Sequence, residues 1–555
     1  MPLLKALRAD SPRHLRIGIC LLAAWLVLAV PAVAVIPLPG PVAPGRPGVE
    51  LAILDPGDAR LPFSAFAAYE GQVGPLEKRL FADAADGRWD EHDLLTASLL
   101  ASGVDQPEAL HRYHRQVAAL VDELRRSGAV AGSPIDEARA IFEFMHRRIL
   151  VAGYARNCTE LADALELGRF NCVSATVLFN CLAERFGLRV CGLETPGHAL
   201  SRLILPDGRL DVETTCPRWF ELAHDPRRQA ELVERTLGAE PAGPPRGPCR
   251  EVCGPQLAAM IYYNRGVDRL AEQRFADALA DNAKALRLDA ASATARGNLL
   301  AALNNWAIAL ASDGRYTDAC ARLEEGLSFD RGYAAFSTNY AHVYYEWVES
   351  LLKAGRYEEA LATLDQGVQR LPGSPYFRPA TLDLYRRWIA ARLAGGRVDE
   401  AWAVLARAEQ RLGRSAELTA AAVAEFNSRA LTLLDEHRFE EAVTFLDGAL
   451  ARWPRAAALG DNRRIAVMHW AEPAFQQGDY AEAIRRTTYG ATPGQLHPAL
   501  LGNLRYGYYH WIEDLRAAGQ SGAAEQVAAR AHHDPFLAGP EQQVGADADS
   551  TGHAF

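Results

Sequence analysis

The chain has 555 residues, of which 49% are hydrophobic and 23% are charged, a composition typical of globular protein and a length that calls for two or more domains. Its formal net charge is -10, from 59 basic and 69 acidic residues, and no basic stripe follows the N-terminus. Nucleic-acid binders present such a stripe, so we expect no nucleic-acid partner.

The first 36 residues indicate export. Four basic residues among the first 16 precede the uncharged stretch IGICLLAAWLVLAVPAVAVI at positions 17–36, which is long enough to span a bilayer as an apolar helix. Either this helix anchors the chain in the membrane, or it is a signal peptide that is cleaved near the small residues at 32–34. In both cases the bulk of the chain is expected outside the cytoplasm.

A Pro-rich linker is expected at 37–60, and a domain with a helical lead-in at 61–235. Helical patterns occur at 75–86, 90–102, 107–128 and 133–150. His111 and His114 stand three apart on the third of these; they are either a metal site or, as we favour without a further ligand at hand, a solvated face. We expect neither a metal nor a cofactor.

A cysteine stands where a further helix is expected to begin. Cys172 follows Asn171 and precedes an amphipathic run from Val173 to Phe186 that ends at Gly187. A helix N-terminus stabilises a thiolate through its unpaired N–H groups and its dipole, so the position suits a nucleophile. Asn171 either caps this helix or contributes to an oxyanion site.

Three strands are predicted after the helix, at 188–194, 198–205 and 209–215. The last two form a hairpin, because Pro206-Asp207-Gly208 is a turn signal. His198 begins one hairpin strand and Asp211 lies on the other, so the two side chains are expected to face each other across the ladder. A cysteine nucleophile needs such a base, and the base needs a group that orients it.

A helix-borne cysteine followed by histidine and aspartate on successive antiparallel strands resembles the transglutaminase-like superfamily. The likeness is carried by FNCVSATVLFNCLAERFGL, PGHALSRL and DEARAIFEFMHRRI, and it covers roughly positions 130–220. The resemblance implies an α+β, cysteine-protease-like domain that acts on amide bonds of a protein or peptide substrate. It implies Cys172 as the nucleophile, His198 as the base and Asp211 as the orienting group.

Two alternatives stay open at this site. Glu213 follows Asp211 by two residues on the same expected strand and is the other candidate for orienting His198. Cys172 is either the nucleophile or a buried thiol in an inactive member of the superfamily.

A second Pro/Gly-rich linker is expected at 236–255. It contains Cys249 and Cys253, which either form a disulfide, as export permits, or remain thiols.

Positions 256–540 repeat with a period of 41 residues in seven copies, and 541–555 are expected to form a disordered tail. In each copy an alanine follows three residues after a position that is aromatic in most copies. These pairs are Phe275/Ala278, Tyr316/Ala319, Tyr357/Ala360, Val398/Ala401, Phe439/Ala442, Tyr480/Ala483 and Ser521/Ala524. Tryptophans keep the same period at Trp306, Trp347, Trp388, Trp470 and Trp511. They either fill the core or contact a ligand, and their strict period favours the core.

The pattern resembles the tetratricopeptide repeat, a helix pair with a small residue where the helices cross. The usual unit has about 34 residues, so seven extra residues are expected, and the unbroken run before Gly355 places them in the first helix. The resemblance implies an all-α solenoid that binds protein partners. We therefore expect an exported, membrane-tethered cysteine enzyme with a protein-binding scaffold; the alternative is a scaffold with an inactive cysteine domain.

Overall fold

The computed structural model describes residues 69–195, 197–222, 227–228 and 249–537. The apolar segment at 17–36, the spacer at 37–60 and the tail at 541–555 lie outside these ranges. Within them, no helix combines the length and apolarity that a membrane crossing requires. The described residues form two compact units that divide between Ser350 and Leu351, and each is considered by itself.

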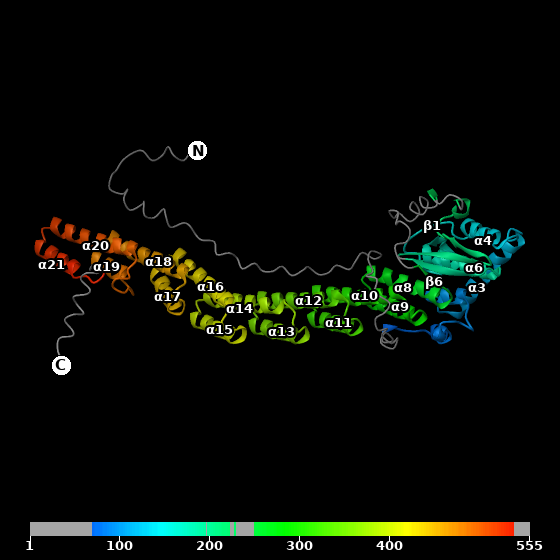
Figure 1. Ribbon diagram of the computed structural model, residues 1–555, viewed down its shortest axis with the longest axis horizontal. Coiled ribbons are helices and arrows are strands. Elements are labelled where there is room, and N and C mark those ends of the chain that lie inside the picture. Colours follow the sequence, from blue (N-terminus) through cyan, green and yellow to red (C-terminus); the bar gives the residue numbers. More distant parts are fainter. Residues whose placement is uncertain (1–68, 196, 223–226, 229–248, 538–555) are drawn as a thin grey trace, which may run out of the picture. The chain divides into compact units, whose positions relative to one another are not determined.

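The first unit opens with helices in the places where the sequence predicts them (Figure 1). They are α1 (Pro75–Asp83), α2 (Leu94–Ala101), α3 (Pro107–Arg126) and α4 (Pro134–Arg148), followed by α5 (Leu161–Leu167) and α6 (Cys172–Arg185). The N-terminus of α4 has the capping residues from which the sequence predicts the start of this helix. Ser133 accepts a hydrogen bond from the Asp136 N–H, Asp136 accepts one from the Ser133 N–H, and Pro134 occupies the first helical position.

A four-stranded antiparallel sheet lies against α6. Its order is β5-β4-β3-β6, with β3 (Val190–Thr195), β4 (His198–Leu205), β5 (Gly208–Val212) and β6 (Arg250–Val252). A short parallel pair joins β1 (Gly153–Tyr154) to β2 (Arg169–Phe170) just before α6. α6 packs on β3 and β4 and buries every residue from Val173 to Ala183. Fully burying each large apolar side chain contributes about 1.5–3 kcal/mol, so α6 is the central element of this core.

β6 corrects the expected linker at 236–255, because three of those residues complete the sheet. β6 pairs with β3 in a register that sets Gly192 opposite Val252. A Cβ at Gly192 would stand 2.8 Å from Leu257 and 3.0 Å from Val252, so only glycine allows this close approach. The chain then runs directly into α8 (Pro255–Ala271), which begins at the next turn.

The same strand pair brings two cysteines together. Cys191 and Cys253 flank the Gly192–Val252 pair, and Cys253 is near enough to raise the pKa of the Cys191 thiol. Cys249 is exposed and forms no disulfide with Cys253. Of the two states expected for Cys249 and Cys253, the structure has thiols.

The C-terminal part of the chain is a solenoid-like series of helix pairs of the tetratricopeptide type, seven of them within the described residues (Figure 1). The first helices are α8, α10 (Ala293–Ser312), α12 (Ala334–Lys353), α14 (Phe377–Ala394), α16 (Ala416–Asp435), α18 (Ala457–Gln476) and α20 (Pro498–Ala517). The second helices are α9 (Phe275–Leu288), α11 (Tyr316–Phe329), α13 (Tyr357–Arg370), α15 (Val398–Leu412), α17 (Phe439–Arg452), α19 (Tyr480–Thr487) and α21 (Ser521–His532). Five of the first helices have 20 residues and four of the second helices have 14, which confirms that the first helix is the longer one.

The repeated alanine is fully buried in every pair. Ala278, Ala319, Ala360, Ala401, Ala442 and Ala483 are 0% exposed and Ala524 is 2% exposed. Two helices approach this closely only where the side chain between them is small. The buried alanines therefore explain the strict period seen in the sequence.

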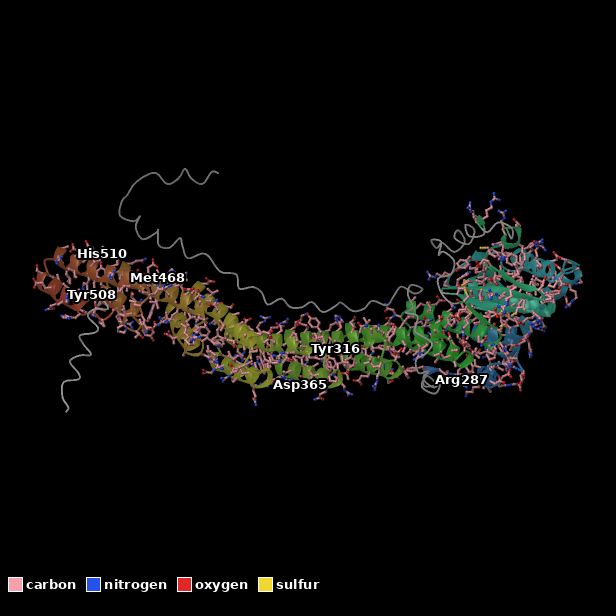
Figure 2. All side chains as sticks on the ribbon, in the orientation of Figure 1. Arg287, Tyr316, Asp365, Met468, Tyr508 and His510 are labelled. Carbon is pink, nitrogen blue, oxygen red and sulfur yellow. The ribbon has the colours of Figure 1, made fainter. Side chains whose placement is uncertain are left out.

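The periodic tryptophans pack against the aromatic residue that opens the preceding second helix. Phe275 stacks on Trp306 at 6.4 Å between ring centroids, and Tyr316, labelled in Figure 2, stacks on Trp347 at 5.9 Å. In the second unit Tyr357 stacks on Trp388 at 5.5 Å. These contacts join one helix pair to the next, which supports a packing role for the tryptophans.

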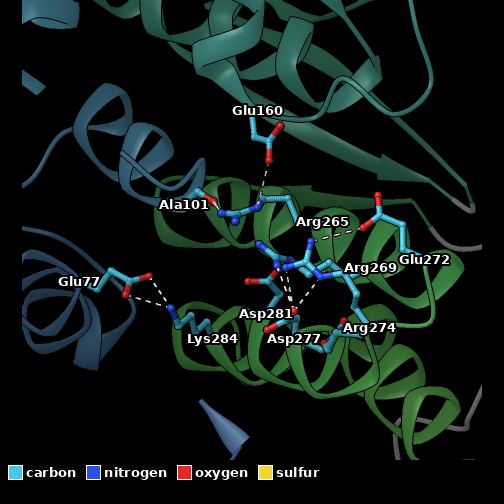
Figure 3. A network of polar contacts seen from close by, with 12 residues as sticks. Glu77, Ala101, Glu160, Arg265, Arg269, Glu272, Arg274, Asp277, Asp281 and Lys284 are labelled. Carbon is cyan, nitrogen blue, oxygen red and sulfur yellow. Dashed lines mark hydrogen bonds and ion pairs between the residues drawn. The ribbon is translucent and has the colours of Figure 1, made fainter. Parts of the chain in front are cut away.

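The first helix pair shares a core with the α+β part of its unit (Figure 3). Lys284 on α9 lies 2.9 Å from Glu77 on α1, and Tyr262 on α8 donates to the same carboxylate at 2.7 Å. Arg265 on α8 donates to the carbonyl of Ala101 at the end of α2. α8 is thus both the first helix of the repeats and a helix that packs against the α+β part of the unit.

Candidate active site

Cys172 is the first residue of α6, and the cap of that helix is well defined. The side chain of Asn171 accepts hydrogen bonds from the N–H groups of Val173 at 2.9 Å and Ser174 at 3.1 Å. Its amide group donates to Thr159 and to the carbonyl of Arg156. Asn171 therefore acts as the cap, and the Cys172 N–H is the first-turn donor that the cap leaves unused.

His198 meets both Cys172 and Glu213. Nε2 of His198 lies 2.6 Å from Oε2 of Glu213, and the Cys172 side chain is near enough to the ring to contribute, with Glu213, to raising its pKa. Because Glu213 holds Nε2, Nδ1 is the ring nitrogen left for the sulfur. Cys172 and His198 are partly buried and Glu213 is 4% exposed, so the carboxylate is the innermost member of the three.

The charges at this site are set by burial and by these hydrogen bonds. Burial disfavours the charged ring, but the hydrogen bonds and charges of Cys172 and Glu213 outweigh it and raise the pKa of His198 to about 10. Burial also disfavours the Glu213 carboxylate, yet donation from His198 and Thr215 holds its pKa below the ordinary value. At neutral pH the ring is therefore an imidazolium between a carboxylate and a sulfur.

Asp211 does not take part, which corrects its assignment as the orienting group. Its carboxylate accepts two hydrogen bonds from Arg202, at 2.6 and 2.8 Å, across the β4–β5 pair. Arg202 also donates to Glu251 on β6. Asp211 thus belongs to an ion-pair network on the sheet, and Glu213, the alternative carboxylate, is the one that meets His198.

The reason lies in the hairpin register. The turn pairs Leu205 with Gly208, so residues whose numbers sum to 413 lie opposite each other, and Arg202 faces Asp211. Arg202 lies four positions after His198 on β4, or roughly 13 Å along the strand. Counting back from the turn at Pro206-Asp207-Gly208 places Arg202, and not His198, opposite Asp211. The expectation that Asp211 faces His198 was therefore wrong.

Glu213 directly follows the last residue of β5, Val212, and so lies two positions nearer than Asp211 to the β4 end that carries His198. Within a strand, Asp211 and a residue two further on would share one face. Beyond Val212 the chain leaves the strand geometry, and residues from Val212 to Cys216 are all buried. The Glu213 carboxylate is then fixed by the N–H and hydroxyl of Thr215, at 3.0 and 2.6 Å.

A second polar cluster flanks the start of β4. Glu194 on β3 accepts hydrogen bonds from Tyr263 on α8 and Thr294 on α10, both at 3.0 Å, and from Arg250 on β6 at 2.8 Å. Burial is the main cause that raises the pKa of Tyr263 well above its usual value, with Glu194 and the Cys172 charge adding to it. The first two helix pairs therefore supply side chains beside the candidate site.

The described residues contain no group of three or more histidine, cysteine or acidic side chains placed to hold a metal ion. On α3, His111 is exposed, whereas His114 lies 3.0 Å from the Thr96 hydroxyl.

Comparison with known proteins adds little to this geometry. No family model matches the chain, and no curated protein matches it. Among solved structures, one similar chain is a tetratricopeptide repeat protein from Parabacteroides merdae, at 14% identity, covering 49% of this chain and 98% of that one, with a TM-score of 0.16. A likeness this weak carries no argument about the site.

The fold and site define the class directly. The protein joins an α+β unit, which carries a cysteine–histidine–glutamate cluster, to helix pairs of the tetratricopeptide type.

Proposed function

We propose that the protein is an exported cysteine enzyme of the transglutaminase-like kind that acts on amide bonds, with its helical repeats serving as a protein-binding scaffold. The observation that carries the proposal is the position of His198, whose ring is held by the buried carboxylate of Glu213 and lies beside the Cys172 side chain at the start of α6. Nucleophile, base and orienting group follow one another as this chemistry requires.

The order of the elements supports the transglutaminase-like assignment. The cysteine opens a buried helix, the histidine opens the next but one element, β4, and the carboxylate follows its hairpin partner β5. Glu213 in place of an aspartate departs from the aspartate that the resemblance implies. A glutamate supplies the same carboxylate on a side chain one methylene longer.

The geometry suggests how each residue acts. The sulfur of Cys172 attacks the carbonyl carbon of a carboxamide or peptide, and the Cys172 N–H donates to the developing oxyanion. The imidazolium of His198 gives its proton to the leaving amine, which departs as the thioester forms. Water or a second amine then attacks the thioester, His198 takes the proton of the attacking group, and the sulfur is released. Glu213 holds the ring in place throughout.

The repeats supply the second part of the proposal. Each helix pair buries its apolar face against its neighbours, and the arrangement of the tetratricopeptide type is used widely to bind proteins. We assign the solenoid the role of binding protein substrates or partners.

Location belongs to the proposal as well. Basic residues before the apolar stretch at 17–36 favour a membrane anchor with the bulk of the chain outside the cytoplasm, and a cleaved signal peptide is the alternative. Protease added to intact spheroplasts should then digest the repeats. Protection of the repeats until the cells are lysed would contradict export.

Selective alkylation tests the active site. Iodoacetamide at neutral pH should modify Cys172 at least about tenfold faster than Cys181, because Cys172 is partly exposed at a helix N-terminus whereas burial raises the pKa of the Cys181 thiol. Cys172→Ala should lose the modification and keep the fold, and His198→Ala should slow it strongly. Equal, slow modification in the wild type and in His198→Ala would contradict the proposal.

Complementation separates the enzyme from a scaffold with an inactive domain. Full-length Cys172→Ala should fail to rescue a deletion strain if catalysis is the function, whereas a scaffold would rescue fully. Point variants are needed, because removing residues from 256 onward would also remove Tyr262 and Lys284 from the core of the first unit.

A further inference from the structure

A cavity of about 390 Å³ opens in the first unit. Its lining is mostly apolar and comes from the end of α4, the β1–β2 pair and the segment after β5. The residues are His146, Leu150, Val151, Gly153, Tyr154, Phe170, Thr215 and Pro217.

The cavity adjoins the candidate active site through three of these residues. Phe170 precedes Cys172 by two residues and lies 6.1 Å from the Tyr154 ring, centroid to centroid. Thr215 donates to the Glu213 carboxylate at 2.6 Å. Burial is the main cause that raises the pKa of Tyr154 to about 12, and the charge of Cys172 is the second cause. The Tyr154 hydroxyl therefore lies near the Cys172 sulfur.

The lining carries no charge at neutral pH. Burial lowers the pKa of His146 to about 4, so its ring is neutral, and Nε2 donates to the carbonyl of Thr214 at 3.0 Å. Its Nδ1 then bears a lone pair, and this buried atom has no hydrogen-bond partner among the described residues. The cavity therefore has mostly apolar, uncharged walls, an environment that excludes a charged group.

We infer that this cavity holds the acyl side of the substrate, and that the group it accepts is bulky, uncharged and apolar, an aromatic or branched aliphatic side chain. The inference rests on the proposed function, because it assigns a substrate class to the same cysteine. The volume suits an aromatic side chain, whose burial here would be favourable. Placing that group in the cavity brings its carbonyl carbon toward the start of α6.

Two activated esters measure this preference. With p-nitrophenyl acetate or p-nitrophenyl 3-phenylpropionate, the Cys172 sulfur attacks the ester carbonyl, a thioester forms, and p-nitrophenolate leaves with the bonding electron pair. Water then hydrolyses the thioester to the acid and regenerates the thiol. The full-length protein should release p-nitrophenolate from the phenylpropionyl ester with a kcat/KM at least about tenfold higher than from the acetyl ester, after correction for uncatalysed hydrolysis.

Val151 provides the matched variants, since its side chain is 66% exposed and lines the cavity. Val151→Trp should fill the mouth and remove the preference, bringing the ratio of the two kcat/KM values close to one. Val151→Ala should retain the preference. Cys172→Ala gives the background rate.

The outcomes test the inference about the cavity separately from the proposed enzyme function. Loss of the preference in Val151→Trp alone supports the inference. Equal kcat/KM for both esters in the wild type, or a preference that survives Val151→Trp, overturns the inference and leaves the proposed function standing. Rates no higher than those of Cys172→Ala with either ester overturn the proposed function, and the inference falls with it.

Discussion

Glu213 Oε2 lies 2.6 Å from Nε2 of His198, with the carboxylate almost fully buried and its other oxygen held by Thr215. A buried carboxylate in this position fixes both the orientation and the charge of the imidazole ring. Glu213 and Asp211 are both acidic and lie two positions apart, but only Glu213 contacts His198, because Asp211 pairs with Arg202.

Glu213→Gln should lower the hydrolysis of p-nitrophenyl 3-phenylpropionate by about two orders of magnitude or more, because a neutral amide no longer stabilises the imidazolium. Asp211→Asn, the matched carboxylate-to-amide change, should leave the rate within about threefold, since Asp211 pairs with Arg202 instead. Rates that fall equally in the two variants would show that the orientation of His198 does not depend on Glu213.

The stability of the protein should decrease between about pH 6.5 and pH 10. The pKa of His198 is raised from 6.5 to about 10 in the folded state, so in this range the folded state binds more protons than the unfolded state. The contribution is fully present below pH 6.5 and is lost as the pH rises through 10. Urea unfolding at pH 7 and pH 10 should show a smaller decrease in Cys172→Ala, which lacks one of the two partners of the ring. An unchanged decrease in that variant would contradict the contact.

Ala360→Leu should destabilise the second unit by about 1–3 kcal/mol, because the added carbons have no room where α13 crosses its neighbour. Ala362→Leu on the same helix is the control. That residue is exposed, so the change should stay within about 0.5 kcal/mol. Thermal melts that cannot distinguish these two variants would contradict the assignment of Ala360 to the helix crossing.

Two glycines in the second unit should respond to alanine with opposite signs. A Cβ at Gly367 would stand 2.3 Å from the Phe377 ring, so Gly367→Ala should destabilise by about 1–3 kcal/mol despite the better helix propensity of alanine. A Cβ at Gly448 on α17 would meet nothing within 4 Å, so Gly448→Ala should stabilise by about 0.5–1 kcal/mol. Denaturant midpoints measure both; a stabilising Gly367→Ala would rule out the tight ring contact.

Oxidised glutathione should join Cys191 to Cys253, which are cross-strand neighbours, while the glutathione disulfide is reduced to two thiols. Peptide mass spectrometry after digestion without reductant should find this link, and Cys253→Ser should abolish it. A dominant Cys249–Cys253 link would show that the β3–β6 pairing opens in solution.

The features that the sequence predicts well share a local or periodic cause. The α4 boundary follows from its capping box at Ser133, and the repeats follow from an alanine that recurs because two helices cross at each copy. The sequence does not predict β6, because a strand of three residues next to a Pro/Gly-rich stretch is too short to show an alternation of apolar and polar residues. The prediction of Asp211 as the partner of His198 was wrong because the register counted from the hairpin turn places Arg202 opposite Asp211. The contact of Glu213 with His198 depends on the path of the chain after Val212, which no sequence pattern contains.

α9 and α1 pack in one core, and this affects how the chain folds while it is being synthesised. Glu77 and Lys284 are 207 positions apart, and β6 is added to the sheet only after residue 250 has been made. The nascent chain therefore cannot close the unit that carries Cys172 until the first helix pair has left the ribosome. Contacts this distant in the chain slow folding. For this protein the first helix pair is a folding requirement of the α+β part of its own unit, as well as the start of the repeats.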